Sequence, residues 1–482
     1  MGNIKDIFDA EDGHVHEQWR KEYGDVFKYK GIFNVDRLVM IDCKAAGHIL
    51  SHSQIYEKPE QIRYSLGQVL GPGDAVARSP SHTTPHPGET HKRQLQDIWT
   101  AEIMKAHDDD GKEGKAKVDV NAWLNKVTLD IIGLAGFNYA FHALNPEDTP
   151  NELHTSIRKM LQNPQGFRSP LPILKALFPP LRLIPSERDR TVRAARQTME
   201  RVGQQLLAEK KAAKGATSAA VEKKNIQGRD LMSLLVKANM ATDLPEGYRM
   251  DDEEVLAQVP TFLVAGHETT STAVTWILFF LSTNPGVQAK LRRELVSVST
   301  ALPGMDELQV LPYLDAVVRE TLRVYSPVPS VIRVASRDDV IPMDRTWVDR
   351  RGAKRSEMRV SKGDMVDVPI LAINRSEEIW GKDAHEFRPE RWDSPPEAAN
   401  AIPGIWGSNL AFSGGSRACI GYRFSVIEMK ALVFVLVRAF QFEMAVPVED
   451  VKVKAAAIRR PFLASEREKG SQLPLWISAI KE

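Results

Sequence analysis

A glycine-rich loop that carries one cysteine and runs directly into an apolar helix is the most constraining feature of this 482-residue chain. The segment spans Phe412–Ile427, and Arg417 stands two residues before Cys419. Glycines allow left-handed or close-approach backbone geometries that a side chain would forbid. A thiol in such a loop can point outward, while backbone N–H groups and the next helix stabilise its thiolate. The pattern indicates a sulfur ligand to iron; the alternative is a buried structural cysteine beside a helix cap.

The composition indicates a large soluble enzyme. With 43% hydrophobic and 26% charged residues, the chain can bury a substantial core. A formal net charge of +1 argues against a nucleic-acid-binding protein, which usually has a clear basic excess. The two cysteines, Cys43 and Cys419, exclude a disulfide scaffold and fit a reducing compartment. Cys43 follows a short apolar run and is expected in a strand or at a strand end.

Hydrophobic patterning predicts few strands and many helices, with no run of about 18 apolar residues that could span a membrane. From residue 118 onward helical patterns dominate. Residues 208–229 are expected to form a frayed helix end and a surface loop, and residues 107–115 a charged loop. Strands are predicted at 26–29, 38–41, 358–360 and 365–368.

A second motif, Ala265–Thr270, places polar residues in the middle of an apolar helix predicted for residues 252–282. A buried carboxylate and hydroxyl are costly unless they have partners or a task. Thr269 can donate its hydroxyl to the carbonyl of Ala265, which bends a helix and opens a groove. Gly266 removes the side chain that would fill this groove. A threonine that only caps a kink is the alternative interpretation.

A third constellation is Glu320 and Arg323, whose spacing puts an acid and a base on one helical face. Alone, this spacing carries little information, because a chain one quarter charged produces it often by chance. It lies within Tyr313–Pro327, which is followed by Phe387–Trp392 and then by the cysteine loop.

These three motifs, in this order, resemble the cytochrome P450 family. The loop fills every fixed position of the family's F-x-x-G-x-R-x-C-x-G pattern, with Phe412, Gly415, Arg417, Cys419 and Gly421. Residues 265–270 are similar to its oxygen-binding A-G-x-[DE]-T-T motif. The segments 313–327, 387–392 and 412–427 resemble its K-helix, meander and haem loop. The resemblance extends from Gly2 to about Pro474.

The resemblance implies a mainly α fold with a smaller β-rich part, in which residues 1–482 form one domain around the haem. Cys419 would be the axial thiolate ligand of haem b, in the loop shaped by Phe412, Gly415 and Gly421. Arg417, Arg333 and His91 would contact the haem propionates. Thr269 would hold dioxygen by a hydrogen bond, with Glu268 relaying protons. The resemblance also implies that Glu320, Arg323 and Arg391 form a buried ion network, which positions the loop.

Two departures from the family pattern stand out. After His91 the family usually has a basic residue four positions on, where this chain has Leu95. About two dozen residues of the following stretch are expected to be missing, judged by usual helix and loop lengths. The start of the chain resembles sequence that follows a membrane anchor and its proline-rich hinge, so the anchor is expected to have been lost.

The resemblance implies a monooxygenase that inserts one oxygen atom of O2 into a small hydrophobic substrate. Electrons would come from a separate NADPH-dependent reductase, with cytochrome b5 as a further donor, since no flavin or nicotinamide fingerprint occurs. The protein would act as a monomer at the cytoplasmic face of the endoplasmic reticulum; without the anchor it would be soluble. The proline-rich segment 167–185 is expected to be an access-channel loop that touches a bilayer, or an ordinary surface turn. Alternatives are a haem-thiolate isomerase or dehydratase, and a non-catalytic haem-binding remnant caused by the shortened region.

Overall fold

The protein is described here from a computed structural model, which covers residues 2–3, 6–7, 15–31, 34–70, 89–110, 114–145, 152, 155, 171–215, 230–240, 250–349, 351–453 and 457–480. The chain forms two compact units. Unit 1 consists of Met1–Pro59, Ile98–Ala122 and Thr269–Glu482, and unit 2 of Glu60–Asp97 and Trp123–Glu268. We describe each unit by itself, and the single domain predicted for residues 1–482 stays a prediction.

The largest sheet of unit 1 has five strands in the order β1-β2-β8-β5-β3. Strand β2 pairs in parallel with β8, while the other neighbours are antiparallel. Apolar residues at the end of β2 are buried, which explains why the short run around Leu38 is a strand. The strands are β1 (Val26–Lys30), β2 (Asp36–Met40), β3 (Tyr56–Glu57), β5 (Val331–Ala335) and β8 (Met365–Val368).

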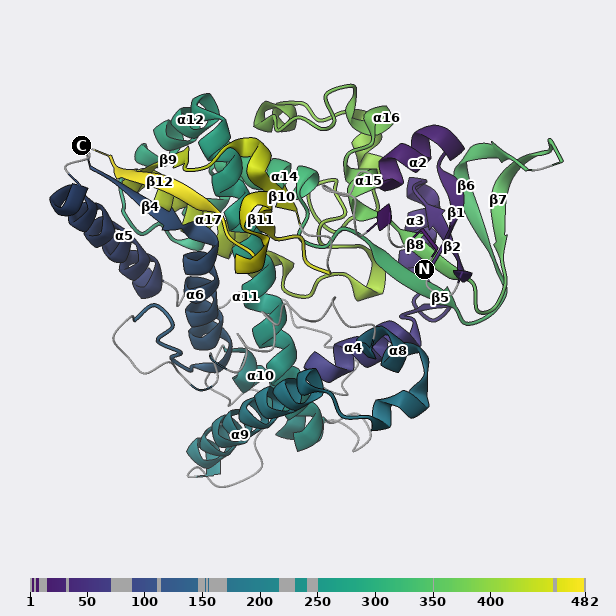
Figure 1. Cartoon of the computed structure of the whole chain (residues 1–482), viewed down its shortest axis with the longest axis horizontal. Coiled ribbons are helices and arrows are strands. Elements are labelled where there is room, and N and C mark those ends of the chain that lie inside the picture. The colour runs from purple at the N-terminus through teal and green to yellow at the C-terminus, as the bar shows by residue number, and fades with distance from the viewer. Residues whose placement is uncertain are drawn as a thin grey trace. The chain divides into compact units, whose positions relative to one another are not determined.

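Helix α3 (Cys43–Ser51) follows this sheet's second strand directly and corrects the expectation for Cys43, which begins a helix rather than ending a strand. The reason is local: the Asp42 carboxylate accepts the Ala45 N–H at 3.0 Å and caps the first turn. Helix α3 lies beside the hairpin of β6 (Asp339–Val348) and β7 (Lys354–Val360), as Figure 1 shows.

A second, three-stranded sheet in unit 1 has the order β4-β12-β9, and all its pairs are antiparallel. Its strands are β4 (Lys115–Asp119), β9 (Phe440–Met444) and β12 (Pro474–Ala479). The two-stranded pair is β10 (Val451–Val453) with β11 (Pro461–Leu463). Helices of this unit are α2 (Val15–Tyr23), α12 (Pro285–Val296), α13 (Met305–Gln309), α14 (Pro312–Val324), α15 (Ile370–Asn374), α16 (Glu377–Trp380) and α17 (Tyr422–Ala439), with short 3-10 turns at Pro389–Asp393, Glu397–Ala401, Gly415–Arg417, Val448–Asp450 and Ala464–Lys469.

Helix α17 forms part of the core of unit 1. Every residue from Val426 to Val437 is buried, as expected for a helix that is apolar around most of its circumference. The same helix begins at Tyr422, immediately after the cysteine loop and four residues before this buried stretch, so the loop is attached to an element anchored in the core.

Unit 2 is built from helices. They include α4 (Glu60–Leu70), α8 (Leu171–Leu177), α9 (Glu187–Gly215) and α10 (Leu231–Met240), with a 3-10 turn at Pro179–Leu183 and a π-helical turn at Gly133–Phe137. Three further helices pass from one unit into the other: α5 (Glu89–Asp110), α6 (Val120–Ile132) and α11 (Asp252–Thr283). In the part of the chain that the structure describes, no helix is long and apolar enough to cross a membrane.

The predicted fold class is confirmed: the chain is mainly α with a smaller β-rich part, and each predicted strand and the helix at 252–282 are present. The helix end predicted from residue 208 agrees with helix α9, which continues to Gly215 in the alanine- and lysine-rich stretch. The charged loop predicted for residues 107–115 is wrong at its start, because helix α5 continues through Asp110.

Candidate functional site

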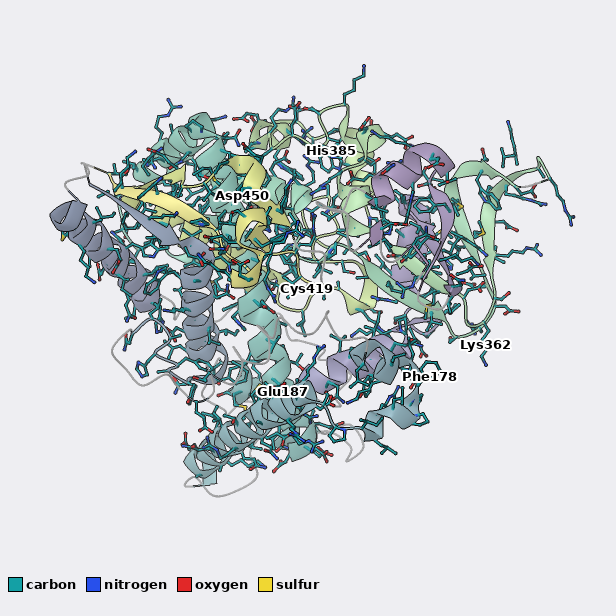
Figure 2. All side chains as sticks on the ribbon, in the orientation of Figure 1. Phe178, Glu187, Lys362, His385, Cys419 and Asp450 are labelled. Carbon is teal, nitrogen blue, oxygen red and sulfur yellow. The ribbon has the colours of Figure 1, made fainter. Side chains whose placement is uncertain are left out.

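The cysteine loop is a tight hairpin-like turn that ends at helix α17. The Cys419 N–H donates to the Phe412 carbonyl at 2.9 Å, and the Ala418 N–H donates to the Gly415 carbonyl at 3.2 Å. Cys419 is a free thiol with solvent access, three residues before the first residue of α17 (Figure 2). The chain therefore presents its sulfur at the start of a buried helix.

Two glycines of the loop are required by close backbone contacts. Gly415 has a left-handed φ of +69°, and a Cβ there would lie 2.1 Å from the Leu50 carbonyl oxygen at the end of α3. A Cβ on Gly414 would lie 2.0 Å from the Pro403 carbonyl oxygen. By contrast, a Cβ on Gly421 would meet no described atom within 4 Å, so no close contact requires a glycine there. Gly414 is not a fixed position of the pattern and was missed.

Although the thiol has solvent access, the pKa of Cys419 lies above the ordinary thiol value, because the protein atoms around it desolvate the charged form more than the Gly421 N–H bond favours it. The predicted stabilisation by backbone N–H groups is thus only partial. A bound metal ion deprotonates a coordinating thiol outright, so an iron ligand needs no further protein group to ionise it.

Two arginines lie close enough to repel each other near this loop. Arg333 in β5 is only 7% exposed, and its Nη1 donates to the Ile332 carbonyl at 3.0 Å. Burial, and then the Arg417 cation, lower the pKa of Arg333 to about 10. Within the described ranges no carboxylate pairs with either guanidinium. Two neighbouring cations of this kind fit a dianionic group, as a haem with its two propionates would be.

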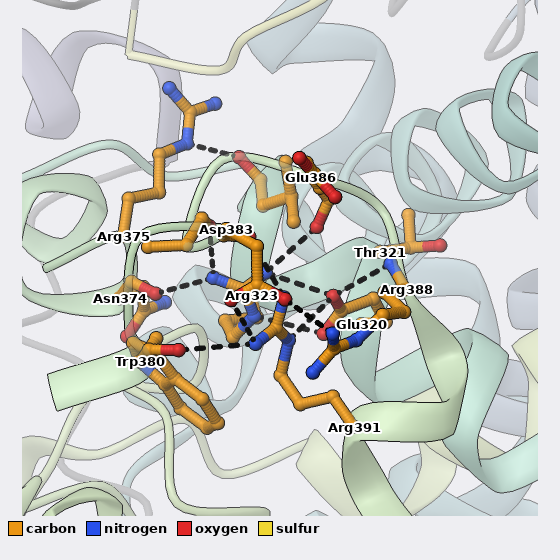
Figure 3. Close-up of polar contacts among 12 residues, drawn as sticks. Glu320, Thr321, Arg323, Asn374, Arg375, Trp380, Asp383, Glu386, Arg388 and Arg391 are labelled. Carbon is orange, nitrogen blue, oxygen red and sulfur yellow. Dashed lines mark hydrogen bonds and ion pairs between the residues drawn. The ribbon is translucent and has the colours of Figure 1, made fainter. Parts of the chain in front are cut away.

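Glu320 is the centre of the buried ion network (Figure 3). Its carboxylate accepts hydrogen bonds from Arg323 Nε and Nη2, both at 2.9 Å, and from Arg391 Nε at 3.1 Å. The Trp392 indole and the Arg388 backbone N–H donate to the same carboxylate, each at 3.0 Å. The structure thus brings Glu320, Arg323 and Arg391 together, fully buried. Trp392 is a further member that the spacing argument did not include.

Asn374 connects this network to the cysteine loop. Its carbonyl accepts from Arg323 Nη1 at 3.0 Å, while its side-chain oxygen accepts the Leu410 N–H at 2.8 Å. Leu410 lies two residues before Phe412. No local sequence pattern singles out Asn374, because its two partners are distant along the chain.

Helix α11 presents a partly open face in its middle. Ala265 is exposed and Thr269, one turn later, is partly exposed, whereas His267 and Glu268 are 5% exposed. The expected role of Gly266 is wrong: a Cβ there would lie 2.9 Å from Ile132 Cγ1, so Gly266 makes room for α6 rather than for a groove. The hydrogen bond predicted from Thr269 to the Ala265 carbonyl stays a prediction.

The next hydroxyl of α11 links this helix to α17. Thr270 Oγ1 lies 3.0 Å from Ser425 Oγ, and Thr270 is buried. This contact was not predicted, because nothing in the sequence distinguishes Thr270 or Ser425 from other polar residues of a helix. It ties the helix carrying Thr269 to the helix that follows Cys419.

His91 lies in unit 2, near the start of α5. Burial lowers its pKa; Asp130 acts in the opposite direction, and His142 adds to the lowering. Asp130 also accepts the N–H groups of Ala143 and Leu144, at 2.9 and 3.0 Å. The predicted propionate contact of His91 stays a prediction, as does the loss of a segment after His91.

Comparison with known proteins agrees with the motifs. The family profile described as Cytochrome P450 matches residues 1–461. The chain is 52% identical to Cytochrome P450 monooxygenase 205 of Postia placenta, over 99% of this chain and 90% of that protein. It is 47% identical to monooxygenase 128 of the same fungus, over 98% and 90%. It is 35% identical to Cytochrome P450 monooxygenase claO of Ampulloclitocybe clavipes, over 97% and 89%. The chain therefore belongs to the cytochrome P450 family of monooxygenases.

Proposed function

We propose that this protein inserts one oxygen atom of O2 into a small hydrophobic organic substrate, using electrons from a separate NADPH-dependent reductase. The observation that carries the proposal is the loop before α17. An accessible thiol lies there, a Cβ on Gly421 would meet no described atom within 4 Å, and no described carboxylate forms an ion pair with Arg333 or Arg417. This set of residues suits a dianionic metal cofactor with one sulfur ligand.

Haem b is the cofactor that these residues would hold. Cys419 would be its axial ligand, and Arg333 and Arg417 would pair with its propionates. When bound, haem with a thiolate ligand supplies the reductive activation of dioxygen, because the sulfur donates electron density that favours O–O cleavage.

The chain's own residues would control protons and water. Glu268, buried on α11, is proposed to carry protons inward, and Thr269 to donate or accept a hydrogen bond at the partly open face beside Ala265. The Thr270–Ser425 contact would keep this face in register with α17. The apolar lining expected of such a pocket excludes water and favours hydrophobic substrates.

Electron donors and location are part of the same proposal. A NADPH–cytochrome P450 reductase would supply the electrons, with cytochrome b5 as an auxiliary donor, and the protein would act as a monomer at the endoplasmic reticulum. Peripheral membrane contact is supported by a cluster of exposed apolar side chains between α8 and α9 (Figure 2 labels Phe178). They are Phe178, Leu183 and Ile184, with 47%, 87% and 48% of their surface exposed. Phe167 and Pro170 of the predicted access-channel loop lie outside the described residues.

The test is a reconstituted turnover with purified protein, haem, reductase and NADPH under 18O2, with a panel of small hydrophobic substrates. One 18O atom per product molecule, found by mass spectrometry and dependent on NADPH, is expected. Thr269→Ala should retain haem but divert most NADPH oxidation to peroxide. Product formed without NADPH would favour an isomerase or dehydratase. NADPH consumption without any oxygenated product, across the panel, would favour the non-catalytic alternative.

A further inference from the structure

Arg319 directly precedes Glu320 in the sequence and lies close to two tryptophan rings. Its guanidinium carbon is 5.6 Å from the centroid of Trp392 and 5.3 Å from that of Trp406. A cation at this distance from an indole face is attracted by the ring's electron density. Arg319 belongs to α14, one residue before Glu320, and about a third of its side chain is exposed.

Asp315 holds this cation in place. Arg319 Nε lies 2.5 Å from Asp315 Oδ2, one helical turn away, and the other carboxylate oxygen lies 2.7 Å from Lys430 Nζ. Lys430 is buried in α17, the helix that follows the cysteine loop. Residues of α14 and α17 together thus restrict where the Arg319 side chain can lie.

Trp406 carries this contact into the cysteine loop. Its ring meets the Phe412 ring edge-on, with centroids 5.6 Å apart and planes at 76°. The Phe412 carbonyl accepts the Cys419 N–H at 2.9 Å. The backbone after Trp406 turns sharply at Gly407, whose φ is +63° and where a Cβ would lie 3.5 Å from Arg319 Cγ. Arg319 therefore contacts both the ring and the turn that lead to Phe412.

We propose that Arg319 is a positioning residue for Cys419: its contacts with the rings of Trp392 and Trp406 fix Phe412 and, through the Phe412 carbonyl, the backbone that presents the sulfur. The inference rests on the proposed function, because it takes Cys419 as the haem ligand. Without the cation, the Trp406 ring loses its contact with Arg319, and the part of the loop around Phe412 can move more. The sulfur then leaves its ligand position more readily.

The test compares Arg319→Met with the wild type, both loaded with haem, reduced under carbon monoxide and followed by absorption. The fraction of the complex that shows the red-shifted thiolate band should fall, and its loss on standing should be about three- to tenfold faster. Arg319→Lys should be intermediate, because a compact ammonium group can keep the pair with Asp315 but reaches the two rings less well than a guanidinium. Trp406→Leu should reproduce Arg319→Met, and the double variant should add little.

Arg438→Met is the matched control for a general loss of stability. Arg438 lies at the end of α17 far from the cysteine loop. Its guanidinium carbon is 5.0 Å from the centroid of the Phe434 ring, and its Nη1 donates to the carbonyls of Val298 and Thr300. It should unfold at lower urea concentration yet keep the thiolate band. Equal loss of the band in this control, full retention in Arg319→Met, or complete rescue by lysine would each overturn the positioning role of Arg319. A wild type without any thiolate band would instead overturn the assignment of Cys419, and the inference with it.

Discussion

Replacing Glu320 with glutamine tests how much the buried ion network contributes to stability. The glutamine side chain would have the same shape as the glutamate, but it would keep only one acceptor oxygen. Its NH2 group would face the guanidinium donors of Arg323 and Arg391, which lie 2.9 and 3.1 Å from the carboxylate. Both arginines are almost completely buried, so neither can turn to water. Removing one partner of a buried ion pair costs about 3–5 kcal/mol.

Glu390→Gln is the matched control, because the chemical change is the same at a half-exposed site. Glu390 accepts from Lys290 Nζ at 2.8 Å and from the Tyr313 hydroxyl at 2.7 Å, and 41% of its side chain is exposed. An exposed pair of this kind contributes up to about 1 kcal/mol. The apparent free energy of unfolding, measured in urea by tryptophan fluorescence and by circular dichroism, should therefore fall several-fold more in Glu320→Gln.

The reasoning is refuted if the two variants lose similar stability. It is also refuted if Glu320→Gln unfolds within about 1 kcal/mol of the wild type. Haem content measured on the same samples adds a second readout. Since Asn374 joins the network to Leu410, Glu320→Gln should also retain less haem than Glu390→Gln at the same urea concentration.

Three further predictions concern individual groups. Iodoacetamide should label Cys419 in haem-free protein at least about tenfold faster than Cys43 at mildly alkaline pH, because burial raises the pKa of the Cys43 thiol to about 12. Peptide mass spectrometry measures the two labelling rates, and haem should protect Cys419 from the label. Arg333→Met should release haem about tenfold faster than Arg337→Met, an exposed neighbour in sequence, when transfer to apomyoglobin is measured; equal rates would contradict the propionate role of Arg333. Burial alone would raise the pKa of Asp339, but hydrogen bonds from His48 and Tyr56, both 2.8 Å, lower it. The stability that the Asp339 carboxylate adds to the folded protein is fully present above the unfolded carboxyl pKa of 3.8, and it is lost as the pH falls through the lower pKa of the folded state. Asp339→Asn should therefore flatten the acid side of the stability curve, and an unchanged slope would contradict this.

Local patterns predicted those parts of the molecule whose physics is local. Short apolar runs located three strands of the five-stranded sheet, β1, β2 and β8, but not β3 or β5. Helical periodicity located α11 to within a residue. The glycine spacing predicted the tight loop, because the backbone at Gly415 is left-handed, a conformation that favours glycine.

Contacts between distant segments could not be predicted in the same way. Gly266 was expected to open a groove, but it accommodates Ile132 from another helix. Asn374, Trp406 and Ser425 each contact residues of other segments, and most of these partners lie far away along the chain. Cys43 was misplaced because the capping effect of Asp42 outweighed the apolar run before it.

The carbon monoxide spectrum of the reduced, haem-loaded protein tests the central claim most directly. Cys419 as the thiolate ligand predicts a red-shifted Soret band in the wild type, with haem retained but the band absent in Cys419→Ser. Cys43→Ser, which changes the other cysteine, should leave the band unchanged. A wild type that binds haem without this band, or a Cys419→Ser variant that keeps it, would contradict the account.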